Sequence, residues 1–118
     1  MSALYVGLDV HKATIVIAVA EEGRGGEVRP HSTIEHTPGS VTKLIHRLEK
    51  SGKELHFCYE AGCCGYGLQR QLIEAGHSCM VVAPSMVPRK SGDHVKTDRR
   101  DALMLARLHR AGELDAVW

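Results

Sequence analysis

The chain has 118 residues, with 43% hydrophobic residues and 15 Lys and Arg against 14 Asp and Glu, which gives a formal net charge of +1. This length fits one domain with a core of its own, and the near-zero charge excludes a uniformly basic, histone-like binder of nucleic acid. No apolar run approaches the roughly 20 residues that a membrane-spanning helix needs, so no membrane partner is expected.

The first third of the sequence predicts an antiparallel meander of three strands. A short apolar run at residues 4–8 is followed, after the segment 10–13, by a second, β-branched run at residues 14–20, and a glycine-rich turn comes next. A third strand at about residues 27–35 contains Pro30, which suits the edge of a sheet because proline cannot donate a ladder hydrogen bond.

After residue 38 the hydrophobic pattern predicts helices that alternate with short strands. We expect Ser40 to cap the first helix, Gly52 to end it, and Ile73 to lie on the buried face of the second. The expected helices cover residues 41–51, 66–75 and 98–111, and the expected strands cover residues 55–60 and 78–83. The order β-β-β-α-β-α-β-α predicts an α/β fold with a mixed five-stranded sheet and helices on both faces.

The four cysteines show no spacing typical of a metal site or a disulfide framework. None of them forms a C-x-x-C pair, and two of them lie inside apolar runs. We therefore expect reduced, mostly buried thiols in a cytosolic protein. The four residues are Cys58, Cys63, Cys64 and Cys79.

Two carboxylates stand at the ends of predicted strands. Asp9 closes the first apolar strand, and Glu60 closes the strand at residues 55–60. If these strands are parallel neighbours, both side chains emerge at the carboxyl edge of the sheet, where α/β folds place their sites. Two uncompensated carboxylates there would repel each other, so a bound cation would explain the pair. The alternatives are an Asx turn at Asp9 and a solvated strand end at Glu60.

Asp98 and Asp101 are spaced to lie on one side of the last predicted helix. A stripe of apolar residues continues from them along the helix, which places both carboxylates at its sheet-facing start. The alternative is that Asp98 caps the helix and Asp101 favours its dipole. Together with the strand-end pair they make four oxygen ligands, which suit a hard cation such as Mg²⁺, and two ions about 4 Å apart would serve phosphoryl transfer.

Three segments carry a family resemblance: residues 5–12 (Tyr-Val-Gly-Leu-Asp-Val-His-Lys), 59–62 (Tyr-Glu-Ala-Gly) and 96–102 (Lys-Thr-Asp-Arg-Arg-Asp-Ala). In this order they resemble the N-terminal domain of DEDD-type insertion-sequence transposases of the insertion sequence 110 type, which are related to the Piv DNA invertase. The resemblance covers essentially the whole chain. It implies a RuvC-like form of the ribonuclease H fold. The implied catalytic and metal-binding tetrad is Asp9, Glu60, Asp98 and Asp101.

The resemblance also implies an activity and partners. Members of the family cut and join DNA at insertion-sequence ends with divalent metal, so two Mg²⁺ or Mn²⁺ ions and a DNA substrate are expected. Some members use a structured noncoding RNA as a guide, and the full-length protein is expected to be a homo-oligomer, cytoplasmic and nucleoid-associated in a bacterial or archaeal cell. The expected catalytic domain spans residues 1–112. Residues 113–118 would begin a linker to a C-terminal domain that supplies a catalytic serine.

A basic segment near the tetrad predicts contacts with nucleic acid. Residues 84–110 contain seven Lys and Arg against three Asp, a local net charge of +4 that suits phosphate binding. His11 and Lys12 follow Asp9 and are equally consistent with hairpin residues, so the expected catalytic set leaves them out. The expected DNA-binding residues are Arg89, Lys90, Lys96, Arg99 and Arg100.

Three other functions compete with transposition. A Holliday-junction resolvase or related nuclease uses the same fold, but the last of the three segments favours the transposase. An ATP-binding domain of the actin and sugar-kinase type also begins with Gly-x-Asp, yet residues 10–12 lack the small phosphate-binding residues of that class. A non-enzymatic nucleic-acid-binding module would be expected to have lost part of the tetrad.

Overall fold

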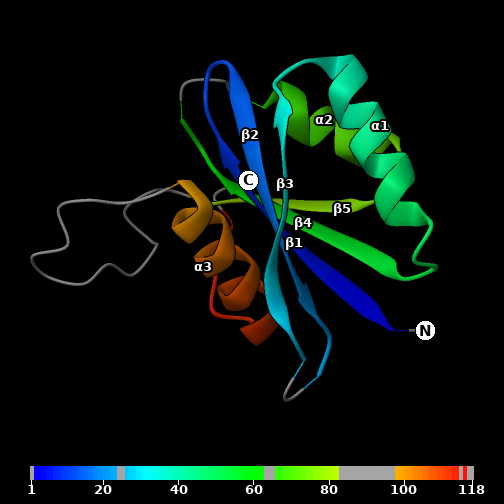
Figure 1. The fold of residues 1–118 in the computed structure, drawn as a ribbon, viewed down its shortest axis with the longest axis vertical. Helices are drawn as coiled ribbons and strands as arrows, with labels where there is room; N and C mark the ends of the chain where they lie inside the picture. Colours follow the sequence, from blue (N-terminus) through cyan, green and yellow to red (C-terminus); the bar gives the residue numbers. More distant parts are fainter. Residues whose placement is uncertain (1, 24–25, 63–65, 83–97, 115, 117–118) are drawn as a thin grey trace, which may run out of the picture.

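Five strands form one mixed sheet, and three helices pack against its two faces (Figure 1). This computed structural model describes residues 2–23, 26–62, 66–82, 98–114 and 116, and the side chains of residues 98–101 lie outside that description. The elements are β1 (Ala3–Val10), β2 (Thr14–Glu21), β3 (Val28–Glu35), α1 (Pro38–Glu49), β4 (Glu54–Glu60), α2 (Gly67–Glu74), β5 (Ser78–Val82) and α3 (Asp98–Ala111). None of the helices in these ranges is long and apolar enough to cross a membrane.

The sheet has the strand order β3-β2-β1-β4-β5, which places β1 at its centre. The pairs β1–β2 and β2–β3 are antiparallel, whereas β1–β4 and β4–β5 are parallel. The predicted meander and mixed sheet are therefore confirmed. Pro30 lies in the edge strand β3, at a point where the pairing register with β2 shifts next to Ala18, as expected for a residue without a backbone N–H.

The main core lies between the sheet and the pair of helices α1 and α2 (Figure 1). Alternate residues of β1 point into it, because successive side chains of a strand point to opposite faces. Val6 of β1 and Phe57 of β4 are fully buried there, and Leu44 of α1 and Leu72 of α2 cover them from the helix side.

Helix α1 begins three residues earlier than the sequence predicts. Its N-cap is Thr37, whose side-chain oxygen accepts a hydrogen bond of 3.2 Å from the backbone nitrogen of Ser40. The prediction of Ser40 as the cap was wrong because Pro38 does not interrupt the helix. It occupies the first helical turn, where its missing N–H has no intrahelical partner to lose.

The buried face of α2 also differs from the prediction. Ile73 is 51% exposed, whereas the polar Gln69 is only 5% exposed. The helix has only eight residues, and its buried row is formed by Leu68, Gln69 and Leu72, so Ile73 lies a further 100° around the helix, toward solvent. Gln69 is satisfied inside because its side-chain nitrogen donates to the carbonyl of Cys79 at 3.4 Å.

On the opposite face α3 lies directly against β1 and β2 (Figure 1). Small side chains make this close approach possible: Ala102 and Ala106 of α3 are fully buried against Ala18 of β2. The tightest point is Gly7, where a Cβ atom would clash with the carbonyl oxygen of Ala102 and lie 2.6 Å from the backbone nitrogen of Ala106. The backbone of α3 thus occupies the space that a side chain at residue 7 would need.

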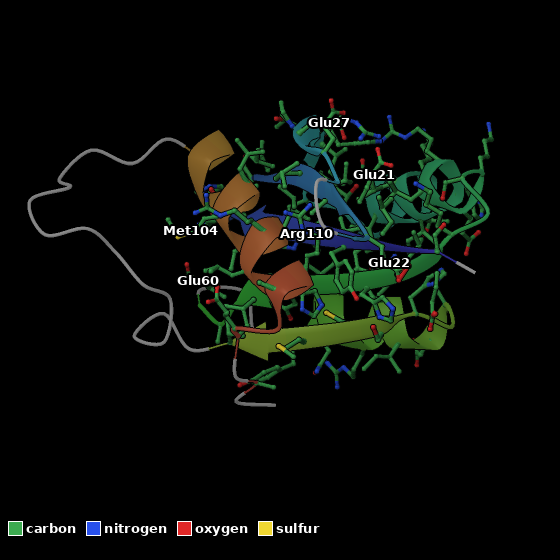
Figure 2. All side chains as sticks on the ribbon, turned by 90° about the horizontal axis from the view of Figure 1, so that it is seen from below. Glu21, Glu22, Glu27, Glu60, Met104 and Arg110 are labelled. Carbon is green, nitrogen blue, oxygen red and sulfur yellow. The ribbon has the colours of Figure 1, made fainter. Side chains whose placement is uncertain are left out.

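The C-terminal end of α3 is tied to the turn between β2 and β3. The guanidinium of Arg110 donates hydrogen bonds of 3.2 Å to the carbonyl of Glu21 and 2.7 Å to the carbonyl of Gly26. Figure 2 shows Arg110 on the side of the helix where Glu21 and Glu27 lie. Beyond the helix, Leu114 is buried, and Ala116 forms an antiparallel bridge with Val82 of β5.

Both described cysteines are reduced, as expected. Cys58 is fully buried under α3, with its Sγ 3.5 Å from the carbonyl oxygen of Leu105, and burial raises the pKa of its thiol. Burial also raises the pKa of the Cys79 thiol, to about 12. These thiols are therefore neutral and unreactive at physiological pH. Cys63 and Cys64 lie outside the described residues.

Tyr5, His56 and His109 form an aromatic cluster near the C-terminal end of α3. The ring of Tyr5 stacks on His56 at 5.2 Å between centroids and meets the edge of His109 at 5.3 Å. Burial, and then the nearby His56, lower the pKa of His109 to about 4. His109 is therefore neutral in the folded protein at neutral pH.

Substitution of Gly7 by Ala tests the close approach of α3. We expect Gly7→Ala to lower the free energy of unfolding by about 1–3 kcal/mol or more. This is the usual cost of forcing extra atoms into a packed interior. Urea denaturation measures the loss. Gly67→Ala is the matched control, because a Cβ at that helical residue would meet nothing within 4 Å, and we expect it to be neutral or slightly stabilising. Equal stability of the two variants would contradict the packing of α3 on β1.

The pKa of His109 predicts a loss of stability in mild acid. The unfolded chain, with an ordinary histidine pKa of 6.5, binds more protons than the folded protein between about pH 6.5 and 4. Stability present above pH 6.5 is therefore lost as the pH falls through this window. We expect His109→Phe to reduce the drop in urea midpoint between pH 7 and pH 5, whereas the exposed His46→Gln should leave it unchanged. An unchanged drop in His109→Phe would refute this origin.

Candidate functional site

Asp9 and Glu60 lie next to each other at the carboxyl edge of the sheet. The parallel ladder of β1 and β4 pairs Leu8 with Tyr59, so the residues that follow on the two strands are Asp9 and Glu60. Neighbouring strands are about 4.8 Å apart. The structure therefore places these two carboxylates side by side on central strands, as the sequence predicts.

Both carboxylates belong to the face of the sheet that α3 covers. On β1, Gly7 meets the backbone of α3, and Asp9 is two residues further along the same face. On β4, Cys58 packs against Leu105 of α3, and Glu60 is again two residues further. Since a strand repeats every two residues, Asp9 and Glu60 share the α3 face.

Helix α3 runs antiparallel to β1 and begins at the edge that carries these carboxylates. His109, near its end, contacts Tyr5 at the start of β1, whereas Ala102 lies beside Gly7. The first turn of α3 therefore lies toward Asp9. Figure 2 shows Glu60 at the same end of the molecule as Met104, with Arg110 further along the helix.

Positions 98 and 101 occupy that first turn. Asp98 precedes Ala102 by four residues, and Asp101 precedes Leu105 by four, so each position lies one helical turn before a residue that is buried on the sheet. Ala102 belongs to the cluster over β2, and Leu105 packs near Cys58 of β4. Backbone placement thus brings both positions to the edge of the sheet where Asp9 and Glu60 lie.

The side chain of His11 contacts that of Asp9. Its Nε2 lies 3.0 Å from Oδ2 of Asp9, and both of these atoms are inaccessible to solvent. The Asp9 side chain is 14% exposed and that of His11 39%. The imidazole therefore shields one side of the carboxylate and limits the directions in which a ligand can reach it.

The turn that carries His11 is held by several backbone contacts. The nitrogen of His11 donates to the carbonyl of Thr14 at 2.8 Å, and the nitrogen of His36 donates to the carbonyl of Ala13 at 3.0 Å. Nδ1 of His36 lies 2.7 Å from the carbonyl oxygen of His11. In the sequence His11 is equally consistent with a plain hairpin residue. The only signal was its position two residues after a strand-end carboxylate.

The donor chemistry of this edge fits a divalent cation, although the described part alone does not complete a site. Carboxylate oxygens are the ligands that Mg²⁺ prefers, and Asp9 is a largely buried one. Among the side chains that the structure describes, no three His, Cys, Asp or Glu come together as a metal site would require. A complete oxygen cage would therefore need the side chains of Asp98 and Asp101.

Most of the predicted DNA-binding residues lie outside the described part of the chain. Arg89, Lys90 and Lys96 fall outside the described residues. Arg99 and Arg100 are in the first turn of α3, beside the two aspartate positions, but their side chains are outside the description. What the structure adds is the position of their backbone at the edge of the sheet that carries Asp9.

The sequence matches known transposases. Residues 6–117 match the family model of the DEDD-type transposases of the IS110 group, whose description is "Transposase". The chain is 54% identical over 114 residues to the putative transposase y4qE of Sinorhizobium fredii (strain NBRC 101917 / NGR234), covering 97% of this chain and 29% of that protein. It is 44% identical over 108 residues to the transposase for insertion sequence element IS1533 of Leptospira borgpetersenii, covering 92% and 31%. The chain thus spans about three tenths of the length of these relatives.

Solved structures show the same fold at low sequence identity. The structure of RuvC from Thermus thermophilus superposes with a TM-score of 0.62 at 13% identity, over 97% of this chain and 99% of that one. The same protein in complex with a Holliday junction substrate gives a TM-score of 0.58 at 12% identity, again over 97% and 99%. The fold is therefore RuvC-like, as the sequence predicts.

Proposed function

The chain belongs to the DEDD-type IS110 family of transposases, and from this membership we propose that it is the divalent-metal-dependent domain that cuts and joins DNA strands in insertion-sequence transposition. One observation carries the proposal: two strand-end carboxylates lie side by side on the face of the sheet where a helix begins with two further aspartate positions. This is the arrangement that a two-cation phosphoryl-transfer site requires.

We assign metal binding to Asp9, Glu60, Asp98 and Asp101. Asp9 and Glu60 come from rigid central strands, and Asp98 and Asp101 from a helix packed on those strands, so no ligand in this proposal depends on a free loop. When bound, Mg²⁺ or Mn²⁺ would supply an activated nucleophile and charge stabilisation at the leaving oxygen. The expected complement is two ions.

His11 is assigned a positioning role at this site. It contacts Asp9 on one oxygen, and the hairpin turn that carries it is fastened to His36. Partners of this kind orient the ligand they touch, and their loss usually costs about 10–100-fold in metal affinity or activity. His11 therefore holds the Asp9 carboxylate toward the start of α3 in this proposal.

DNA is the proposed substrate, and the basic residues Arg89, Lys90, Lys96, Arg99 and Arg100 are its proposed contacts. In this proposal residues 1–112 form the catalytic domain, and residues 113–118 lead toward a second domain of the kind that the family resemblance implies. A guiding RNA and a homo-oligomeric state belong to the same proposal for the longer protein.

Holliday-junction resolution is the alternative function. The likeness to RuvC favours it only at the level of the fold, because the identity is 13%. The 54% identity to a putative transposase favours insertion-sequence ends over four-way junctions as the substrate.

Substitution of Asp9 by Asn tests the metal centre. We expect Mn²⁺ to raise the melting temperature of the unsubstituted chain, because a ligand that binds only the folded state stabilises it, and Asp9→Asn to abolish this rise. Placed in the full-length transposase, the same substitution should lower strand cleavage more than the roughly 100-fold expected for loss of an outer partner. Differential scanning fluorimetry and cleavage of labelled insertion-sequence ends provide the two measurements.

The control is Glu74→Gln, which removes one negative charge from the exposed end of α2. It should keep both the Mn²⁺ effect and cleavage. Full cleavage by Asp9→Asn, or an equal Mn²⁺ effect in both variants, would refute the proposed site. Preferred cleavage of four-way junctions over insertion-sequence ends would support the alternative.

A further inference from the structure

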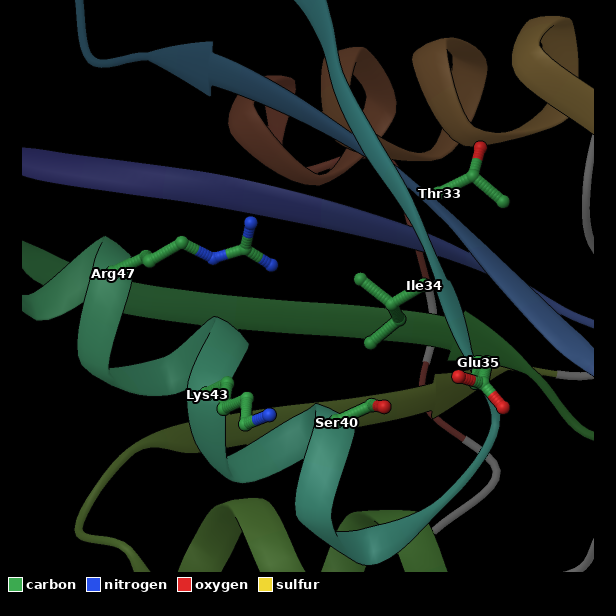
Figure 3. A pocket seen from close by; sticks show the side chains of 6 residues that line it. All are labelled: Thr33, Ile34, Glu35, Ser40, Lys43 and Arg47. Carbon is green, nitrogen blue, oxygen red and sulfur yellow. The ribbon is translucent and has the colours of Figure 1, made fainter.

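A groove runs between the edge strand β3 and helix α1, away from the carboxylates (Figure 3). Its volume is about 570 Å³. Figure 3 shows the side chain of Ile34 directed toward α1 and that of Thr33 directed toward the side of α3, so the groove wraps around the edge of the sheet. The lining residues are Thr33, Ile34, Glu35, Ser40, Lys43 and Arg47.

Two uncompensated cations lie on the helix side of this groove. Lys43 and Arg47 are one turn apart on α1, both exposed, and neither forms an ion pair with any residue whose side chain the structure describes. By contrast, Arg29 and Lys53 both contact Glu21, at 2.6 and 3.1 Å. Lys43 and Arg47 therefore remain available for an external anion.

The positive field of Arg47 reaches along the edge strand. Burial lowers the pKa of His31, and the nearby cations Arg47 and Arg29 lower it further. Glu35 is the one acidic residue among those that line the groove. With two hydroxyl groups, from Thr33 and Ser40, the lining is complementary to phosphate groups.

One lining residue of the groove lies near the proposed metal centre in the sheet. In the sheet register Asp9 pairs with Val16 of β2, and Val16 pairs with Thr33 of β3. Thr33 is therefore two strand spacings, about 10 Å, from Asp9 along a line perpendicular to the strands. This distance is slightly less than the width of the major groove of a DNA duplex, about 12 Å.

We propose that the β3–α1 groove binds the phosphate backbone of the DNA that the metal centre cuts, with Lys43 and Arg47 as the phosphate contacts. This inference rests on the proposed function, since it names a second contact surface for the same substrate. In this proposal the DNA that reaches the carboxylates also extends past Thr33 at the sheet edge to the two cations on α1. Contacts of this kind fix register and orientation rather than sequence.

The salt dependence of DNA binding tests the groove. Binding of a labelled duplex to the chain is followed by fluorescence anisotropy at several salt concentrations, in EDTA so that no metal-dependent cleavage occurs. We expect the double variant Lys43→Gln and Arg47→Gln to weaken binding several-fold and to reduce the slope of log K against log salt by about 1.8, or 0.9 for each lost phosphate contact. The charge-conserving pair Lys43→Arg and Arg47→Lys should keep the slope.

The matched control is the pair Lys50→Gln and Arg70→Gln. It removes one Lys and one Arg from exposed positions, at the C-cap of α1 and on α2, outside the groove, and should leave the slope unchanged. Glu35→Gln should tighten binding, because it removes the negative charge from the lining. Equal slopes for the groove and control pairs would overturn the proposal, and so would preferred binding of a single-stranded RNA that depends on the same two residues.

The two proposals fail in different ways. The groove variant should keep the Mn²⁺-induced rise in melting temperature, and Asp9→Asn should keep the salt slope. Loss of the slope in the groove variant together with full cleavage by Asp9→Asn would refute the metal centre and leave the groove as a DNA-binding surface. Absence of DNA binding by the unsubstituted chain would overturn the groove proposal and leave the metal centre to the Mn²⁺ measurement.

Discussion

The close approach of α3 to the centre of the sheet is the constraint on which the rest of this structure depends. At Gly7 the helix backbone takes the place of a side chain, and the alanines of α3 and β2 keep the two elements in contact. Such an interface buries little apolar area for each residue, so it relies on shape rather than on large side chains. It tolerates few substitutions, because any added atom meets backbone.

This contact sets the geometry of the proposed metal centre. Because Ala102 lies beside Gly7, the preceding turn of the helix lies at the end of β1, where Asp9 stands. Arg110 fastens the other end of the helix to the β2–β3 turn, so the helix is held at both ends of its length. The packing of the helix does not depend on the charges of its aspartates. This packing would hold the aspartates in place against the repulsion among neighbouring carboxylates until cations bind.

The proposed metal centre and the β3–α1 groove lie on different parts of the molecule. Asp9 and Glu60 lie at the carboxyl edge on the α3 face, whereas Lys43 and Arg47 lie on α1, which packs on the opposite face. In the proposed function the two regions act on one DNA backbone: metal ions held by the carboxylates would neutralise charge at the reacting phosphate, and Lys43 and Arg47 would hold a neighbouring part of the strand.

The sequence by itself determined the order of elements and the mixed sheet, because the hydrophobic period is local. It placed Asp9 and Glu60 at strand ends that are neighbours only if the two strands pair in parallel, and the structure shows that they do. The predictions of Ser40 as the cap of α1 and of Ile73 as a buried residue were wrong. The first depends on the place of Pro38 in the helix, and the second on which side of the short helix α2 packs on the sheet. Only the tertiary structure revealed that Gly7 admits the helix backbone, that His11 contacts Asp9 and that Lys43 and Arg47 form no ion pair with the described side chains. Each of these depends on residues far apart in the chain, or on the direction of a side chain after folding, and no local pattern encodes that.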